Sequence, residues 1–139
     1  MASAKLILVA VDVADRNDLV LRWAAALARA EGASLLIATV EPGNPTSKFG
    51  HLYAGIADPG IADVAKALAM LEPPDGCPFE HRILSGSPGV ELLKCAAAES
   101  AIAIVVGRHA GSHMQRLFAP GVVDEIVHGA HCPVLICKL

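Results

Sequence analysis

The sequence predicts a doubly wound α/β domain, in which helices cover both faces of a five-stranded parallel sheet. Two observations lead to this prediction. Short, continuous apolar runs, which are typical of strands buried on both faces, alternate with stretches of helical periodicity. The alternation begins and ends with a strand, and right-handed crossovers join parallel strands in such a chain. The length of 139 residues suits a single core, so we expect one domain over residues 1–139.

The amino-terminal part predicts two strands around one helix. Lys5–Val11 and Leu35–Val40 are strand-length runs rich in Leu, Ile and Val. Asp15–Glu31 repeats apolar residues every three or four positions, which predicts an amphipathic helix, and Gly32 stands where a helix end favours a left-handed residue. The stripe that we expect to face the sheet consists of Leu19, Trp23, Leu27 and Ala30.

The rest of the chain is predicted to alternate in the same way. Glu41–Pro59 is a long polar connection, which predicts a lid or a segment ordered by a partner. Gly107–Ala119 is a second polar loop, rich in Gly, Arg and His. The expected elements are a helix over Ile61–Leu71, a strand over Phe79–Leu84, a helix from Ser87-Pro88 to Glu99, a strand over Ala101–Val106, a helix over Pro120–His128 and a final strand over Pro133–Lys138.

Composition excludes several classes of function. The net charge of −3 offers no basic footprint for nucleic acid. The apolar runs fall short of the roughly 18 residues that a spanning helix needs, and no secretory signal is recognisable at the amino terminus. We therefore expect a cytoplasmic protein without a membrane or nucleic-acid partner. The four cysteines form no C-x-x-C pair and are interpreted as reduced, mostly buried thiols.

A candidate site follows from the strand ends. Ligands of doubly wound sheets bind beyond the carboxyl ends of the strands, where the strand order reverses. Asp12 ends the first strand, and Gly107, Arg108 and His109 follow the fourth. If these two strands are neighbours, their ends share one crevice. The helix that starts at Pro120 would aim its free N–H groups at that crevice, which predicts an anion site.

These same residues carry a resemblance to a known family. Leu6–Val11 followed by Asp12 resembles the opening strand of universal stress proteins, and the stretch from Ile104–Gly107 to Cys132-Pro133-Val134 resembles their carboxyl-terminal segment. The resemblance covers nearly the whole chain. It implies the strand order 3-2-1-4-5, a homodimer, and two subclasses of which one binds ATP. It also implies that Asp12 contacts the ribose and that Val40 lies at the adenine-contacting position.

The ATP-binding subclass carries the motif G-x2-G-x9-G-S/T after the fourth strand, and this sequence departs from it. In an ungapped alignment Gly107 matches the first glycine, Ala110 stands at the second, Pro120 at the third, and Gly121 at the hydroxyl residue. Alanine adds a methyl group where the backbone approaches phosphate, and proline removes an N–H donor. Glycine in the last position removes the hydroxyl donor.

A shifted alignment leaves the motif damaged as well. Gly111 and Gly121 then preserve the nine-residue spacing, but Val122 replaces the hydroxyl residue. Under either alignment the first turn of the helix keeps free N–H groups at Gly121 and Val122. Arg108 and His109 can both donate hydrogen bonds and could replace lost phosphate contacts.

Each candidate also has a purely structural interpretation. Asp12 suits the cap of a turn, Gly107 a tight turn, and Arg108 and His109 a solvated loop. Ser85-Gly86-Ser87 lacks the surrounding G-x-S-x-G pattern of a nucleophile elbow, and no catalytic or metal-binding set is indicated.

The sequence therefore predicts a stress-response binding module and not an enzyme. We expect it to act through its conformation or through protein partners, with ATP or AMP bound weakly or not at all. The alternative is an ATP- or AMP-dependent switch or a slow ATP hydrolase. Val134–Lys138 is an apolar edge strand in the implied order, and pairing with a second copy would satisfy its backbone, which predicts a homodimer.

Overall fold

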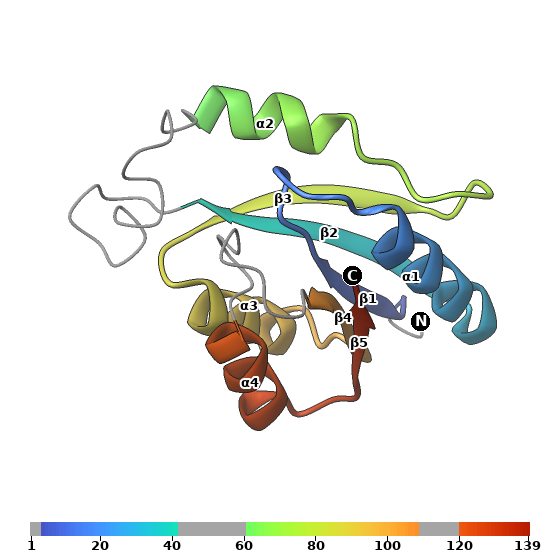
Figure 1. Ribbon diagram of the computed structural model, residues 1–139. Coiled ribbons are helices and arrows are strands. Elements are labelled where there is room, and N and C mark those ends of the chain that lie inside the picture. The colour runs from blue at the N-terminus through green and yellow to red at the C-terminus, as the bar shows by residue number, and fades with distance from the viewer. Residues whose placement is uncertain (1–3, 42–60, 109–119) are drawn as a thin grey trace.

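The computed structural model describes residues 4–41, 61–108 and 120–139. Strands and helices alternate along these residues as the sequence predicts (Figure 1). The elements are β1 (Leu6–Ala10), α1 (Asp18–Glu31), β2 (Ser34–Glu41), α2 (Ile61–Ala69), β3 (Phe79–Ser85), α3 (Pro88–Ala98), β4 (Ala103–Arg108), α4 (Pro120–Gly129) and β5 (Val134–Lys138).

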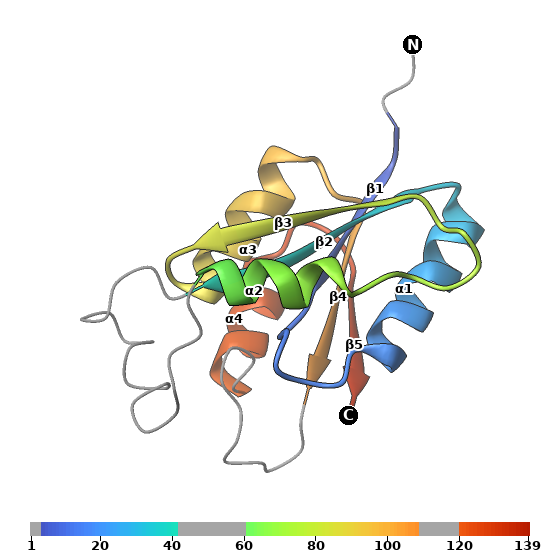
Figure 2. The same cartoon turned by 90° about the horizontal axis from the view of Figure 1, so that it is seen from above.

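The five strands form one parallel sheet in the order β3-β2-β1-β4-β5 (Figure 2), which confirms the predicted fold and strand order. The central strand β1 pairs with β2 on one side and with β4 on the other, so that Ala10 lies opposite Ala38 and Val106. The strand order reverses between β1 and β4, and the sheet edges are β3 and β5.

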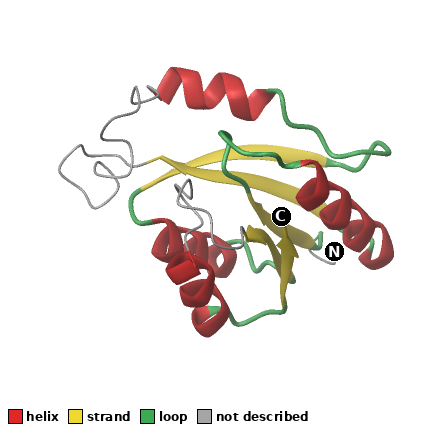
Figure 3. Cartoon of the chain, viewed as in Figure 1, coloured by secondary structure: helices red, strands yellow, loops and turns green. Residues whose placement is uncertain are grey.

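Helices cover both faces of the sheet (Figure 3), with α1 and α2 on one face and α3 and α4 on the other. Val9, Ile37 and Val105 point to the first face, whereas Leu8, Leu36 and Val106 point to the second. Successive side chains of a strand face opposite sides, so a strand with helices on both sides must be apolar throughout. This explains the continuous Leu, Ile and Val runs. Full burial of each such side chain contributes about 1.5–3 kcal/mol to folding.

The buried stripe of α1 differs from the predicted one. The buried residues are Val20, Leu21, Ala24, Ala25 and Ala28, and the predicted Leu19 and Leu27 pack against them while partly buried. Ala30, also predicted to face the sheet, is exposed. Trp23, which we expected to be buried, is 50% exposed. Small alanines let the helix axis approach the sheet closely, and this turns the larger Trp23 outward. The predicted end of the helix is confirmed, because Gly32 adopts a left-handed conformation with φ 64° and the Ala33 N–H donates to the Ala28 carbonyl.

Several element boundaries also differ from the prediction, by one to three residues, and two of them lie next to the candidate site. Helix α1 begins at Asp18 instead of Asp15, because the residues before it form turns that Asn17 holds. Strand β4 runs through Gly107 and Arg108, which the sequence placed in a loop. The strand is longer because these two residues pair with Cys137 and Lys138 of β5, a contact between segments that are far apart in sequence.

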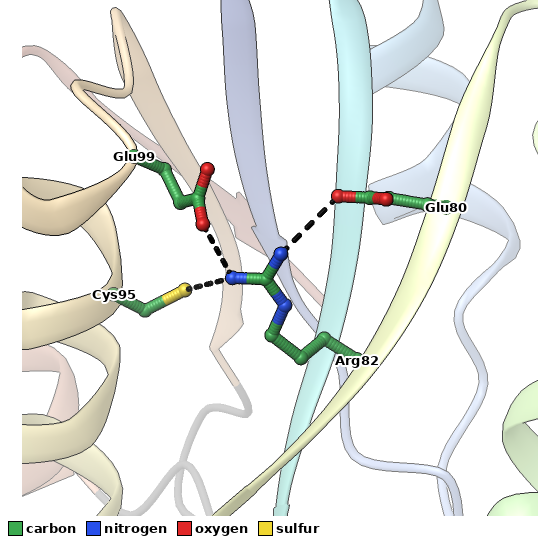
Figure 4. A network of polar contacts seen from close by, with 4 residues as sticks. All are labelled: Glu80, Arg82, Cys95 and Glu99. Carbon is green, nitrogen blue, oxygen red and sulfur yellow. Dashed lines mark hydrogen bonds and ion pairs between the residues drawn. The ribbon is translucent and has the colours of Figure 1, made fainter.

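A polar network ties the edge strand β3 to α3 (Figure 4). Arg82 donates from Nη1 to Glu99 Oε1 at 2.6 Å and lies 3.9 Å from Cys95 Sγ, while its Nη2 is 3.3 Å from Glu80 Oε1. The bond to Glu99 is the largest influence on the Arg82 pKa, which it raises. Burial raises the pKa of the Cys95 thiol, and Arg82 opposes this with a smaller effect. Cys95 is therefore a neutral packing residue beside a charged pair.

Three other predictions, on the cysteines, on membrane spans and on the lid, can be compared with the described residues. All four cysteines are free thiols, and two of them, Cys95 and Cys137, are buried. None of the helices in the described part of the chain has both the length and the apolar character needed to cross a membrane. The predicted lid over Glu41–Pro59 lies outside the described residues beyond Glu41.

Candidate functional site

Three of the predicted site residues lie at one level across the centre of the sheet. Ala38, Ala10 and Val106 are register partners on β2, β1 and β4. Two residues further along each chain segment stand Val40, Asp12 and Arg108. Adjacent strands are about 4.8 Å apart, so these three positions lie side by side at the carboxyl edge of the sheet, a place called the notch below. The expectation that the first and fourth strands are neighbours is thereby confirmed.

Asp12 is held in a defined position at this notch. The residue is buried, at 7% exposure, and its Oδ1 accepts a hydrogen bond from the Ala14 N–H at 2.9 Å. Asn17 Nδ2 donates to the carbonyls of Asp12 and Asp15, at 3.0 Å each. Aspartate readily forms such turns with the backbone two residues on. Asp12 therefore caps a turn, as its structural interpretation predicts, and this cap fixes a carboxylate at the end of β1.

Gly107 has a different role from the tight turn that the sequence predicts. It is a buried residue of β4, and its backbone is not among the positive-φ glycines of the described residues. A Cβ atom at this position would lie 2.7 Å from Leu139 Cδ1 and 3.1 Å from Val20 Cγ2. The glycine is needed here because α1 and the residue after β5 pack closely against the strand.

Arg108, the last residue of β4, brings a positive charge to the notch. Its Nη2 lies 3.8 Å from Asp124 Oδ1 of α4, and both side chains are substantially exposed, at 39% and 59%. An exposed ion pair of this kind is worth about 0–1 kcal/mol, so Arg108 can exchange Asp124 for another anion. His109, the adjacent candidate, lies outside the described residues.

The two candidates on α4 have different surroundings. Gly121 is exposed in the first turn of the helix, and a Cβ at this position would have no atom of the described residues within 4 Å. Val122 is half-buried and packs against the core on the α3 and α4 face. Space for a hydroxyl side chain therefore exists at Gly121. Val40, at the end of β2, is 1% exposed and packs in the same core as Val122.

Several polar contacts near the ends of β2 and β3 were not predicted from the sequence. Ser85 Oγ donates to Glu41 Oε1 at 2.5 Å, and the Gly86 N–H donates to the Glu41 carbonyl at 3.2 Å. These contacts join the ends of β3 and β2, with Gly86 at φ 127°. Together with the Arg108–Asp124 pair, they connect residues from distant parts of the chain, so no local pattern could have indicated them. In the described residues no group of three His, Cys, Asp or Glu side chains could hold a metal ion.

A parallel sheet of this order, with a buried carboxylate just beyond the central strand, defines a doubly wound α/β protein. Comparison with known families makes the assignment specific. The model of the universal stress protein family matches residues 4–138, and the chain belongs to that family. The resemblance inferred from the sequence is thereby confirmed.

Individual relatives agree with this assignment. A universal stress protein of Methanocaldococcus jannaschii is 30% identical over 63 residues, which cover 45% of this chain and 37% of that protein. The matched part is thus well under half of that relative's length. A universal stress protein structure from Archaeoglobus fulgidus is 27% identical, with a TM-score of 0.70 and coverage of 96% of this chain and 98% of the other. A structure from the same organism in complex with dAMP is 25% identical, with a TM-score of 0.61 and 98% coverage of both chains.

Proposed function

We propose that this chain is a universal stress protein that acts through its conformation or through protein partners, with ATP or AMP bound weakly or not at all. The proposal rests on a difference between the two sides of the notch, the side expected to bind ribose and the side expected to bind phosphate. Asp12 at the end of β1 is a fixed carboxylate suited to a ribose hydroxyl. The first turn of α4 offers Pro120 and Gly121 where the family motif has a glycine and a hydroxyl residue, so the phosphate side has fewer donors.

The most direct test is calorimetry with ATP and with AMP, each with and without magnesium. We expect no saturable binding of ATP, or binding that is weak compared with a repaired variant carrying Ala110→Gly, Pro120→Gly and Gly121→Ser. The serine at position 121 would meet no atom within 4 Å among the residues that the structure describes, so it introduces no clash with them. Tight binding of ATP by the unmodified protein, with contacts from residues 107–123, would overturn the proposal.

A matched control shows whether the restored motif residues raise the affinity for ATP specifically or only through a general change in charge or folding. Asp12→Asn in the repaired variant keeps the side-chain shape but removes the negative charge next to the predicted ribose. We expect this control to lose most of the affinity that the repair restores. If the repaired variant gains no affinity, the missing motif residues are not the cause of weak binding, and this explanation fails.

A nucleotide-dependent switch is the second candidate, because the Archaeoglobus fulgidus relative bound to dAMP aligns with nearly the whole chain. A monophosphate needs fewer donors from the first turn of α4 than a triphosphate does. This candidate predicts measurable AMP or dAMP binding and absorbance near 260 nm in the purified protein. It also predicts that Asp12→Asn abolishes the AMP binding of the unmodified chain.

We also propose that residues 1–139 form one domain that assembles as a homodimer through β5. Among the residues that the structure describes, β5 has a strand partner on one side only, and three of its residues are half-buried and apolar: Val134, Leu135 and Ile136. Pairing with the same strand of a second copy would bury them and satisfy the free backbone edge.

A further inference from the structure

A cavity of about 310 Å³ lies at the amino-terminal edge of the sheet, at the opposite end of the strands from the notch. It is bounded by α1 on one side and by the connection from α2 to β3 on the other. The residues that line it are Arg22, Ala25, Ala26, Arg29, Ala33, Pro74, Asp75, Gly76, Cys77 and Pro78. A volume at the lower end of the range for ligand pockets suits a small molecule.

One face of α1 forms the first wall. Arg22, Ala25, Ala26 and Arg29 recur at the spacings of three and four that place residues on one side of a helix. The two alanines leave the middle of this wall hollow, and Ala33 widens the hollow at the start of β2. The result is an apolar trough with an arginine at each end. The two arginines are seven residues apart, which is about 10.5 Å along the helix axis.

The second wall is a turn whose shape the backbone fixes. Asp75 and Gly76 both adopt left-handed conformations, with φ 63° and 67°. The Cys77 N–H donates to the Pro74 carbonyl at 3.4 Å, and the Leu35 N–H donates to the Pro78 carbonyl at 2.9 Å, which anchors the turn to β2. The hollow is therefore built by the fold and does not depend on the rotamer of one side chain.

The charge at the cavity is positive overall, although the chain as a whole carries −3. Asp75 lies 3.4 Å from Arg29, but both side chains are largely exposed, so this pair is weak. Its single contact engages one of the five donors of the Arg29 guanidinium. Burial raises the pKa of the Cys77 thiol more than Arg29 lowers it, so Cys77 is neutral near pH 7 and does not repel an anion.

We infer that this cavity binds a small, elongated organic dianion, whose two carboxylate or phosphate groups contact Arg22 and Arg29 while its apolar middle lies on the alanines. Two guanidinium groups would recognise the anionic groups of this ligand, and the methyl groups and proline rings that line the trough would contact its apolar middle. Guanidinium forks pair well with both kinds of anion. This site goes beyond the proposed function and requires neither a nucleotide nor a second copy of the chain.

The test uses the dicarboxylates suberate and succinate, with octanoate as a monocarboxylate of the same length as suberate. Binding to the full chain is followed by amide chemical shifts and by the emission of Trp23, the single tryptophan, which adjoins Arg22. Every titration is matched in ionic strength with sodium chloride. We expect suberate to bind most tightly, with shift changes concentrated in residues 22–33 and 74–78. Because it contacts both arginines, its affinity should exceed that of octanoate roughly two- to five-fold.

Four exposed-residue variants complete the test, and all of them should fold because no core contact changes. Arg22→Gln and Arg29→Gln should each weaken suberate binding roughly two- to five-fold, whereas Arg16→Gln, which removes a cation outside the cavity, should leave it unchanged. Asp75→Asn should strengthen binding, because it removes the nearby carboxylate and asparagine tolerates the left-handed backbone. Equal binding of all three acids, absence of binding, or equal effects of Arg16→Gln and Arg22→Gln would overturn the inference.

Discussion

Replacement of Gly107 by alanine distinguishes a packing role for this residue from the turn role that the sequence predicts. The new methyl group would lie 2.7 Å from Leu139 Cδ1 and 3.1 Å from Val20 Cγ2, so Leu139 must move. Overpacking typically costs about 1–3 kcal/mol. The same substitution lowers the entropy of the unfolded chain, which stabilises the fold by about 0.4–1 kcal/mol where the backbone conformation is permitted. The net expectation is a loss of about 1 kcal/mol in the free energy of unfolding.

The double variant with Leu139→Ala makes this prediction specific. Removing the Leu139 side chain eliminates the shortest contact, so Gly107→Ala should become neutral or slightly stabilising in that background. The coupling between the two sites should be about 1 kcal/mol, measured as midpoint differences in urea unfolding at constant m-value. In a thermal melt the single variant should lose about 3–5 °C. Had Gly107 occupied a left-handed turn, alanine would be equally destabilising with or without Leu139, and that result would refute the packing role.

Other substitutions test the β3 network, the buried thiols and the β5 edge. Glu99→Gln should destabilise the protein by about 0.5–1 kcal/mol and speed hydrogen exchange in β3, because the ion pair of Glu99 with Arg82 is only about one-third exposed. Glu80→Gln is the control, and it should have a smaller effect because the ion pair of Glu80 with Arg82 is more exposed. Burial raises the pKa of the thiols of Cys95 and Cys137 above 9.0, so the folded state holds these protons more tightly than the unfolded chain. The contribution of these two thiols to the free energy of unfolding should therefore be fully present below pH 9 and decrease as the pH rises above it. The double variant Cys95→Ala and Cys137→Ala should show a smaller decrease in urea titrations. Leu135→Glu should convert the proposed dimer to a monomer in sedimentation velocity; a monomeric unmodified protein would contradict that assembly.

Much of the fold could be predicted because its signals are local. Lys5–Val11 and Leu35–Val40 are apolar at every position, and only strands covered on both faces require that pattern. The buried face of α1 could not be predicted in this way, because alanine is compatible with either side of a helix. The sheet selects Ala24 and Ala28 for close approach and leaves Trp23 outside, and this choice depends on residues elsewhere in the chain.

The candidate site was predictable to a similar extent. The side-by-side ends of β1 and β4 follow from the family resemblance, and the register places Asp12 and Arg108 at one level. The partner of Arg108 on α4 and the cavity between α1 and the Pro74–Pro78 turn could not be predicted. Both depend on distances between segments that approach each other only after folding.

The two halves of the notch are built in different ways, and this difference has a consequence for which nucleotide would bind best. Asp12 and Val40 belong to the central strands or directly follow them, where core packing and the Asn17 bonds hold the backbone. In the proposed nucleotide site the phosphate side would be formed by the motif from Gly107 to Gly121, which departs from the family pattern at Ala110, Pro120 and Gly121. Under this proposal each departure would remove a contact to phosphate, and none would remove a contact to the nucleoside. The ratio of ATP to AMP affinity should therefore rise when the motif is repaired, whereas a proportional rise in both affinities would show that the damage lies on the nucleoside side.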